Sequence, residues 1–171
     1  VFDKTGTLTV SSPKVAEVVS LDPDWTEDEV LKISACLEEH FPHPVARAVV
    51  KAAEQKNLAH EEEHAEVEYI VGHGIASKLR GQHLVIGSRH FVEEDEGVSC
   101  AFAQNQIEAI ASTGHSVLYL AMGQKLIGLI GIEDPLRDES KYVIARLRQM
   151  GIPHIVMITG DGEKTAANVA A

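Results

Sequence analysis

Apolar and polar residues follow one another in two different patterns, which divide the chain into outer and inner parts. Near both ends, short uninterrupted apolar runs lead into polar loops: Val1-Phe2 precedes Asp3, and residues 155–158 precede Thr159. Such runs are typical of strands covered on both faces of a parallel sheet. The inner part instead shows the alternation and Gly-containing turns of antiparallel strands. Its predicted strands cover residues 15–19, 67–71, 75–79, 83–86, 116–122 and 125–132.

Two helices are predicted between the first inner strand and the rest of the inner part. Residues 26–29 form a capping box, with Thr26 as the N-cap and Glu29 three residues later. Apolar residues then recur at helical spacing up to about Glu39. A second helix is expected from Pro44 to about Gln55, because proline suits the first turn of a helix. His43 would lie in the corner between the two helices.

Three further helices are expected towards the carboxyl end. The first covers residues 100–112, with Phe102, Ile107 and Ile110 directed inward. The second follows Asp134-Pro135 and places apolar residues up to Met150 on one face, and the third begins near Glu163. We therefore predict an α/β protein in which residues 1–13 and 127–171 form one domain. Residues 14–126 form an inserted α+β domain built on an antiparallel sheet.

Composition narrows the possible functions. With 44% hydrophobic residues in 171, the chain can bury a core and is not of a disordered class. A formal net charge of −11 argues against nucleic acid as a partner. No apolar run reaches the length of about 18 residues that a membrane-spanning helix needs. The chain starts within a predicted strand and stops within a predicted helix, so we expect it to be a piece of a larger protein.

Asp3 is the first candidate for chemistry. It follows an apolar strand and precedes a turn that contains Thr5, Gly6 and Thr7. A carboxylate at the carboxyl end of a strand can attack a phosphoryl group and form an aspartyl-phosphate. Thr5 cannot act as a general base for hydrolysis of that intermediate. A long-lived acyl-phosphate suits an energy-coupling enzyme more than a phosphatase.

Residues 3–9, with the sequence DKTGTLT, resemble the phosphorylation motif of P-type ATPases. Thr159, at the end of the other apolar strand, would meet Asp3 at the same sheet edge and, with the N–H groups of Gly160 and Asp161, hold the phosphoryl group. This arrangement resembles the haloacid-dehalogenase superfamily. The resemblance implies a partial haloacid-dehalogenase-like Rossmannoid phosphorylation domain, in which Asp3 is the nucleophile and Lys4 and Thr5 help hold the transferring group.

The inner part resembles the nucleotide-binding domain of heavy-metal-transporting P-type ATPases, because His43-Pro44 is followed by Val45-Ala46. In that branch the adenine is held by a Glu, this His and a Gly-x-Gly. The resemblance therefore implies adenine binding by the set Glu38, His43, Gly72 and Gly74, with Gly87 as a further cleft residue. Asp134, in an Asp-Pro segment, would face the nucleotide near the phosphorylation site.

The resemblance implies the ATP-binding and phosphorylation region of an ATP-driven heavy-metal transporter, on the cytoplasmic side of an integral membrane protein. ATP and Mg²⁺ are the expected cofactors, with Mg²⁺ at Asp3 and Thr5; the motif that carries its partner carboxylate is absent from this chain. Expected partners are the transported transition-metal ion and the transmembrane and actuator domains of the same protein. Two alternatives stay open: a soluble phosphatase of the same superfamily with a large cap, and a nucleotide-binding module without catalysis.

Overall fold

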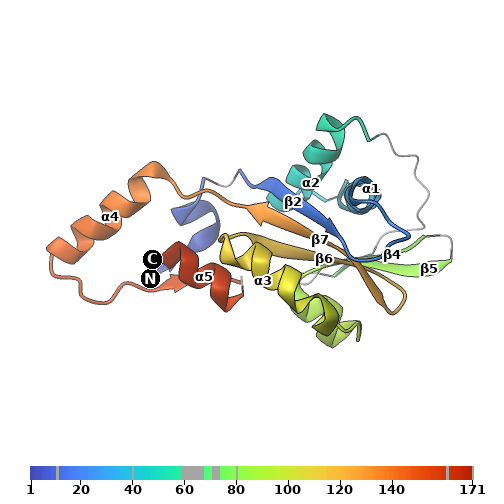
Figure 1. Cartoon of the computed structure of the whole chain (residues 1–171). Helices are drawn as coiled ribbons and strands as arrows, with labels where there is room; N and C mark the ends of the chain where they lie inside the picture. The colour runs from blue at the N-terminus through green and yellow to red at the C-terminus, as the bar shows by residue number, and fades with distance from the viewer. Residues whose placement is uncertain are drawn as a thin grey trace.

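The centre of the molecule is a six-stranded antiparallel sheet with the strand order β2-β7-β6-β5-β4-β3 (Figure 1). The computed structural model describes residues 1–10, 12–39, 41–58, 68–70, 74–79, 81–160 and 162–170. The strands are β2 (Lys14–Ser20), β3 (Glu68–Ile70), β4 (Gly74–Leu79), β5 (Gln82–Gly87), β6 (Ser116–Met122) and β7 (Lys125–Glu133). Neighbouring pairs β4–β5 and β6–β7 confirm the two predicted hairpins.

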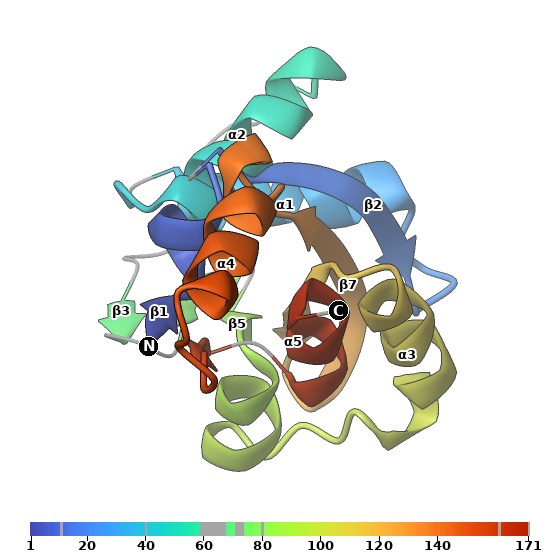
Figure 2. The same ribbon diagram turned by 90° about the vertical axis from the view of Figure 1, so that its left-hand side faces the viewer.

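Helices cover both faces of this sheet (Figures 1 and 2). On one face lie α1 (Glu27–Glu38) and α2 (Pro44–Gln55), and on the other lie the helical turn η2 (Phe91–Asp95), the short 3₁₀ turn η3 (Ala101–Ala103) and α3 (Gln104–Ser112). Alternate side chains of the central strands enter the two cores. Val85 and Leu129 pack with the α3 side, whereas Leu120 and Ile130 pack with the α1 and α2 side.

The capping box predicted for the first helix is present. The Glu29 N–H donates to Thr26 Oγ1 at 3.2 Å, and the Thr26 N–H donates to Glu29 Oε2 at 2.7 Å. Together these bonds satisfy donors that the start of a helix leaves unpaired. Val30 and Leu37 are fully buried, as their spacing predicted.

The predicted inward position of Phe102 is wrong. Its side chain is 62% exposed, whereas Ala103, Ile107 and Ile110 are buried. The reason is the 3₁₀ turn η3, which precedes α3 and changes the angular spacing between successive side chains from that of an α-helix.

A second, two-stranded sheet joins the ends of the chain. β1 (Phe2–Asp3) pairs in parallel with β8 (Met157–Ile158), which confirms that the two apolar runs lie side by side. The expectation that the second run is covered on both faces is wrong, because Val156 and Ile158 are 53% and 60% exposed. The described part of the chain places no further strand beside these two and leaves both side chains uncovered.

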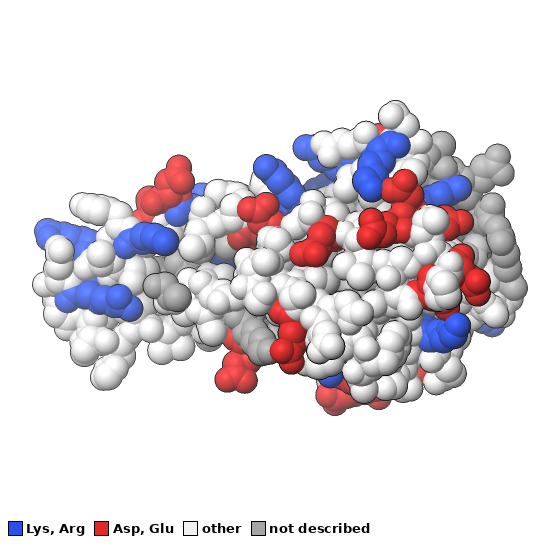
Figure 3. Space-filling view, viewed as in Figure 1, with Lys and Arg blue, Asp and Glu red and all other residues white. Residues whose placement is uncertain are grey.

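The helix α4 (Asp138–Gln149) extends from this end of the molecule, and α5 (Glu163–Ala170) follows β8. Lys and Arg side chains gather over the far end of α4, at the left of Figure 3. Acidic residues in the first turn of α4 and Arg146 and Arg148 in its last turn complement the helix dipole. None of the helices in the described ranges is long and apolar enough to cross a membrane.

The strand β7 crosses the predicted domain boundary between residues 126 and 127. It runs without interruption from Lys125 to Glu133 and pairs with β6 and β2 along this length. A boundary between residues 126 and 127 would cut this strand. The division into residues 14–126 and the two outer segments stays a prediction, and we propose about Glu133 as the end of the inserted domain.

Candidate active site

The corner between α1 and α2 positions two of the predicted side chains. Glu38 is the last residue of α1, and its carbonyl accepts a hydrogen bond from the Phe41 N–H at 3.0 Å. His43 is the N-cap of α2, and its Nδ1 accepts the Val45 N–H at 3.3 Å. The bond to Nδ1 fixes the imidazole and makes this nitrogen an acceptor, which leaves Nε2 as the nitrogen for a ligand.

Gly74 and Gly87 lie directly opposite each other at the ends of β4 and β5. A Cβ atom on Gly74 would lie 2.5 Å from Phe91 Cδ1 and would also overlap the carbonyl oxygen of Ile86. No side chain fits at residue 74 unless the strand or the phenyl ring moves. The need for glycine here is therefore steric, and it leaves this end of the sheet flat.

We expect Gly74→Ala to lower the free energy of unfolding by about 1–3 kcal/mol, the usual cost of overpacking a well-filled site. Urea denaturation measures this change. Gly160→Ala is the matched control, because a Cβ at residue 160 meets no atom within 4 Å. Equal stability of the two variants would contradict the close packing of β4, β5 and Phe91.

These residues open into one cavity of about 690 Å³ at the end of the sheet. Five predicted residues line it: Glu38, His43, Gly74, Gly87 and Gly160. The other walls come from residues after β5, from α3, from the start of β6 and from the start of α5; the polar ones are Ser88, Arg89, His90, Gln104, Glu108, Ser116, Tyr119, Glu163 and Thr165. The volume falls within the range of small-molecule sites.

Glu38 gives the cavity an unusual carboxyl group. The residue is only 8% exposed, and its side chain has no hydrogen-bond partner among the described residues. Burial raises the pKa of this carboxyl from 4.5 to about 7, because the charged form loses solvation. Near neutral pH, Glu38 can therefore either donate or accept a hydrogen bond.

Asp3 occupies the end of β1, beside Ile158 of β8, so that Thr159 follows directly on the neighbouring strand. Asp3 and Thr5 are exposed, whereas Lys4 is 3% exposed and lies buried beneath the loop. Gly6 has a φ of +83°, which favours glycine, and its N–H donates to Thr9 Oγ1 at 2.9 Å. The loop therefore turns sharply just after the carboxylate and leaves Asp3 accessible.

The segment that enters α4 holds this loop in place. Ser140 Oγ donates to the Leu8 carbonyl at 2.8 Å, and Arg137 Nη2 donates to the Gly6 carbonyl at 3.3 Å. Asp134 lies at the start of the same segment, half-buried, with an Oδ1 that has no partner among the described residues. The structure thus places Asp134 in the segment that supports the Asp3 loop.

The predicted site residues form two groups. The first group lines the cavity and consists of Glu38, His43, Gly74, Gly87 and Gly160. Asp3, Lys4, Thr5, Thr159 and Asp134 are not among the residues that line the cavity. Two other predicted residues, Gly72 and Asp161, lie outside the described residues.

The helix α5 is held against the end of α3 by side-chain hydrogen bonds. Thr165 Oγ1 donates to the His115 carbonyl at 2.9 Å, and Asn168 Nδ2 donates to the carbonyls of Ala111 and Ser112, each at 3.0 Å. These bonds satisfy carbonyl groups at and just after the end of α3. They hold the start of α5 against the cavity.

Arg89, Gln104 and Glu108 are polar lining residues that sequence reasoning missed. None of the three belongs to a motif. Gln104 and Glu108 are four residues apart on α3, and only the packing of η2 and α3 brings Arg89 to Gln104. Arg89 follows Gly87 by two residues, and this proximity was the one available signal. No group of three or more His, Cys, Asp or Glu side chains that could hold a metal ion occurs within the described ranges.

A family model described as haloacid dehalogenase-like hydrolase matches residues 1–171. The chain belongs to this family over its whole length, which agrees with the parallel pairing of β1 and β8 behind Asp3.

Within this family, the chain is similar to one region of metal-exporting P-type ATPases. Over 99% of its length it is 35% identical to the zinc-exporting P-type ATPase of Mycobacterium marinum, and 36% identical both to the manganese-exporting P-type ATPase of Mycobacterium bovis and to the copper-exporting P-type ATPase of Legionella pneumophila. It spans 22–24% of the length of these relatives. The resemblance indicated by residues 3–9 and by His43-Pro44 is thereby confirmed.

Solved structures show the same relationship. A zinc-transporting PIB-type ATPase in its E2.Pi state matches 99% of the chain with a TM-score of 0.68 and 29% identity, over 26% of its own length. The N-domain of HMA8, a copper-transporting P-type ATPase, matches 70% of the chain with a TM-score of 0.60 and 27% identity, over 99% of its own length. A separate N-domain thus corresponds to the larger part of this chain.

Proposed function

We propose that this chain is the ATP-binding and phosphorylation region of a P-type ATPase that transports a transition-metal ion, on the cytoplasmic side of the membrane. The observation that carries the proposal is the cavity that joins Glu38, His43, Gly74 and Gly87 at one end of the sheet. These residues come from α1, α2, β4 and β5. The sequence predicts Glu38, His43 and Gly74 as adenine contacts and Gly87 as a further residue of the cleft.

The chemistry of the cavity suits a purine. The glycine pair leaves a flat surface for the ring, and the fixed imidazole of His43 offers a face or a ring nitrogen for contact. Glu38, with a pKa near 7, can pair with the exocyclic amino group or with a ring nitrogen of adenine. Each of these contacts would recognise the base and leave the phosphate chain free to extend towards Asp3.

Asp3 would then accept the γ-phosphoryl group. Its carboxylate oxygen would attack phosphorus, the bond to the β-phosphate oxygen would break, and ADP would leave. Mg²⁺ would neutralise the phosphate charge, with Asp3 and Thr5 as the oxygen donors that this chain offers. Thr5 stands where a second carboxylate would act as a general base for hydrolysis. Its presence therefore favours a long-lived phosphoenzyme, which suits a transporter better than a phosphatase.

His43→Ala tests the adenine site. We expect calorimetric titrations with ATP and AMP to show micromolar to millimolar binding to the wild type and a loss of at least about 10-fold in the variant, because one well-made contact is worth about 1.4 kcal/mol or more. His43→Asn should lose affinity equally, although Asn preserves a capping group for α2. His154→Ala, at an exposed residue outside the cavity, is the control. Full affinity in both His43 variants would refute the adenine site.

A further inference from the structure

Arg89 is the one Lys or Arg among the residues described as lining the cavity. The other ionisable groups there include the carboxyls of Glu38, Glu108 and Glu163, and the chain as a whole carries a net charge of −11. A nucleoside triphosphate brings several negative charges into these surroundings. A guanidinium is permanently charged and matches the geometry of phosphate oxygens, so Arg89 is the protein group best suited to receive them.

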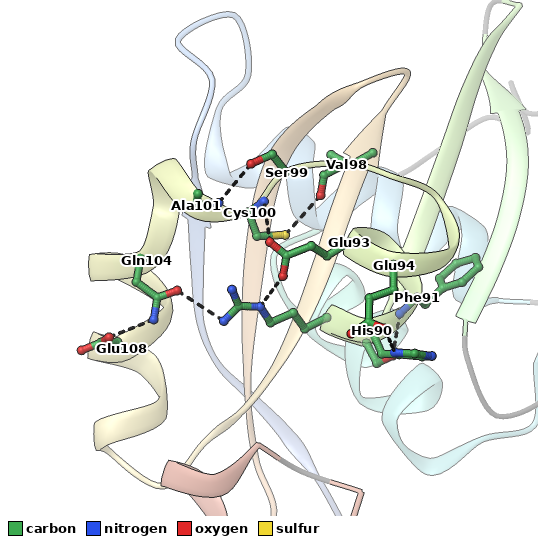
Figure 4. Close-up of polar contacts among 12 residues, drawn as sticks. His90, Phe91, Glu93, Glu94, Val98, Ser99, Cys100, Ala101, Gln104 and Glu108 are labelled. Atoms are coloured by element: carbon green, nitrogen blue, oxygen red, sulfur yellow. Dashed lines mark hydrogen bonds and ion pairs between the residues drawn. The ribbon is translucent and has the colours of Figure 1, made fainter.

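Two neighbours, Glu93 and Gln104, fix the Arg89 side chain; both neighbours are labelled in Figure 4. Nε donates to Glu93 Oε2 at 2.7 Å, and Nη1 donates to Gln104 Oε1 at 3.3 Å. Glu93 is fixed in turn, because its Oε1 accepts the N–H of Cys100 at 3.3 Å. The guanidinium is therefore held between the start of η2 and the start of α3 before any ligand arrives.

The same contacts leave part of the guanidinium available. Nη2 has no hydrogen-bond partner among the described residues, and the Arg89 side chain is 44% exposed. The Gln104 amide separates Arg89 from the next carboxylate, since its oxygen accepts from Arg89 while its Nε2 donates to Glu108 Oε1 at 2.8 Å. Arg89 thus has one carboxylate partner, Glu93, and keeps donors for an anionic ligand.

The place of Arg89 along the chain fits this role. It lies two residues after Gly87, which faces Gly74 at the proposed adenine end of the cavity. If the base of a ligand lies against Gly74 and Gly87, its phosphate chain can reach the polar lining residues that follow Gly87, which include Arg89 and His90.

We propose that Arg89 binds the phosphate groups of the nucleotide and that Glu93 is a positioning residue for Arg89. This proposal rests on the proposed adenine site and deepens it, since it assigns the recognition of the phosphate chain to the inserted domain itself. It needs no contribution from the Asp3 loop.

Calorimetric titration with adenosine and with ATP separates the two parts of the ligand. Arg89→Gln should lower the affinity for ATP by about 10-fold or more and change the affinity for adenosine by less than about twofold, because charged hydrogen bonds to phosphate are lost and the base contacts stay. Arg89→Lys should retain an intermediate affinity for ATP. Lys51→Gln, which removes a positive charge from an exposed residue of α2 outside the cavity, should change neither affinity.

Glu93→Gln tests the positioning role. A freed guanidinium should bind ATP several-fold more weakly while the affinity for adenosine stays the same. A purely structural loss would reduce both affinities together, so the ratio of ATP to adenosine affinity is the decisive readout.

Two results would overturn the proposal, and they differ. If Arg89→Gln leaves the affinity ratio at the wild-type value while adenosine binding still depends on His43, the phosphate assignment is wrong and the adenine site stands. If the wild type binds no adenosine, the proposed adenine site is wrong, and the proposal for Arg89 is wrong with it.

Discussion

Asp3→Asn is expected to abolish phosphoenzyme formation in the complete ATPase. An amide is a far weaker nucleophile than a carboxylate and cannot form the acyl-phosphate, so ATP turnover should fall by three orders of magnitude or more, on the order of other nucleophile deletions. The measurement is the transfer of radioactive phosphate from ATP to protein, followed by acid precipitation. The wild-type label should be released by hydroxylamine, as an acyl-phosphate requires.

Asp138→Asn is the matched control for this experiment, because it removes an exposed carboxylate from the first turn of α4 at the same end of the molecule. It should retain the label. Nucleotide affinity should survive in Asp3→Asn, because Asp3 does not line the cavity. A labelled Asp3→Asn protein would exclude Asp3 as the phosphorylated residue.

Glu38→Gln is expected to remove a large pH dependence of stability. The pKa of Glu38 is raised by burial from 4.5 to about 7, so the folded state binds its proton more tightly than the unfolded state does. The contribution of this group to stability is therefore complete below about pH 4.5 and is lost as the pH rises towards 7. The difference between the two pKa values corresponds to about 3 kcal/mol.

Urea denaturation of wild type and variant at pH 5 and pH 8 measures this effect. At pH 8 the variant should be more stable than the wild type by about 1–3 kcal/mol, since the neutral amide costs less to bury than a carboxylate. Glu54→Gln, at an exposed residue of α2, should show the same pH dependence of the free energy of unfolding as the wild type. If the free energy of unfolding of the wild type falls between pH 5 and pH 8 no more steeply than that of Glu38→Gln, then Glu38 is not desolvated.

Much of the inserted domain could be predicted because its signals are local. The capping box at Thr26 and the proline at residue 44 give both helices with the correct starts, since each acts within one helical turn. The hairpins follow from alternation and turn residues in the same way. The parallel pairing of β1 with β8 was also predicted, although it joins the two ends of the chain, because both apolar runs end in a polar loop residue.

The environment of single side chains could not be predicted in the same way. Glu38 and Glu39 are adjacent glutamates, and only the packing of α1 against its neighbours buries the first and exposes the second. The ion pair between Arg89 and Glu93 has a local signal, because the two residues are four apart in a helical turn. The contact of Arg89 with Gln104 depends instead on how η2 and α3 pack, which no periodicity encodes. Exposure of Ile158 depends equally on which elements lie over a strand, and a run of apolar residues does not contain this information.

The most direct test is an NMR titration of the wild-type chain with Mg-ATP, in which backbone amide shifts locate the nucleotide. The largest changes should fall on residues of the cavity, above all His43, Gly74, Gly87 and Arg89, and residues on the far end of α4 should not respond. Changes confined to the loop after Asp3, with none at Gly74 and Gly87, would contradict the adenine site and would favour a phosphatase that recognises phosphate alone.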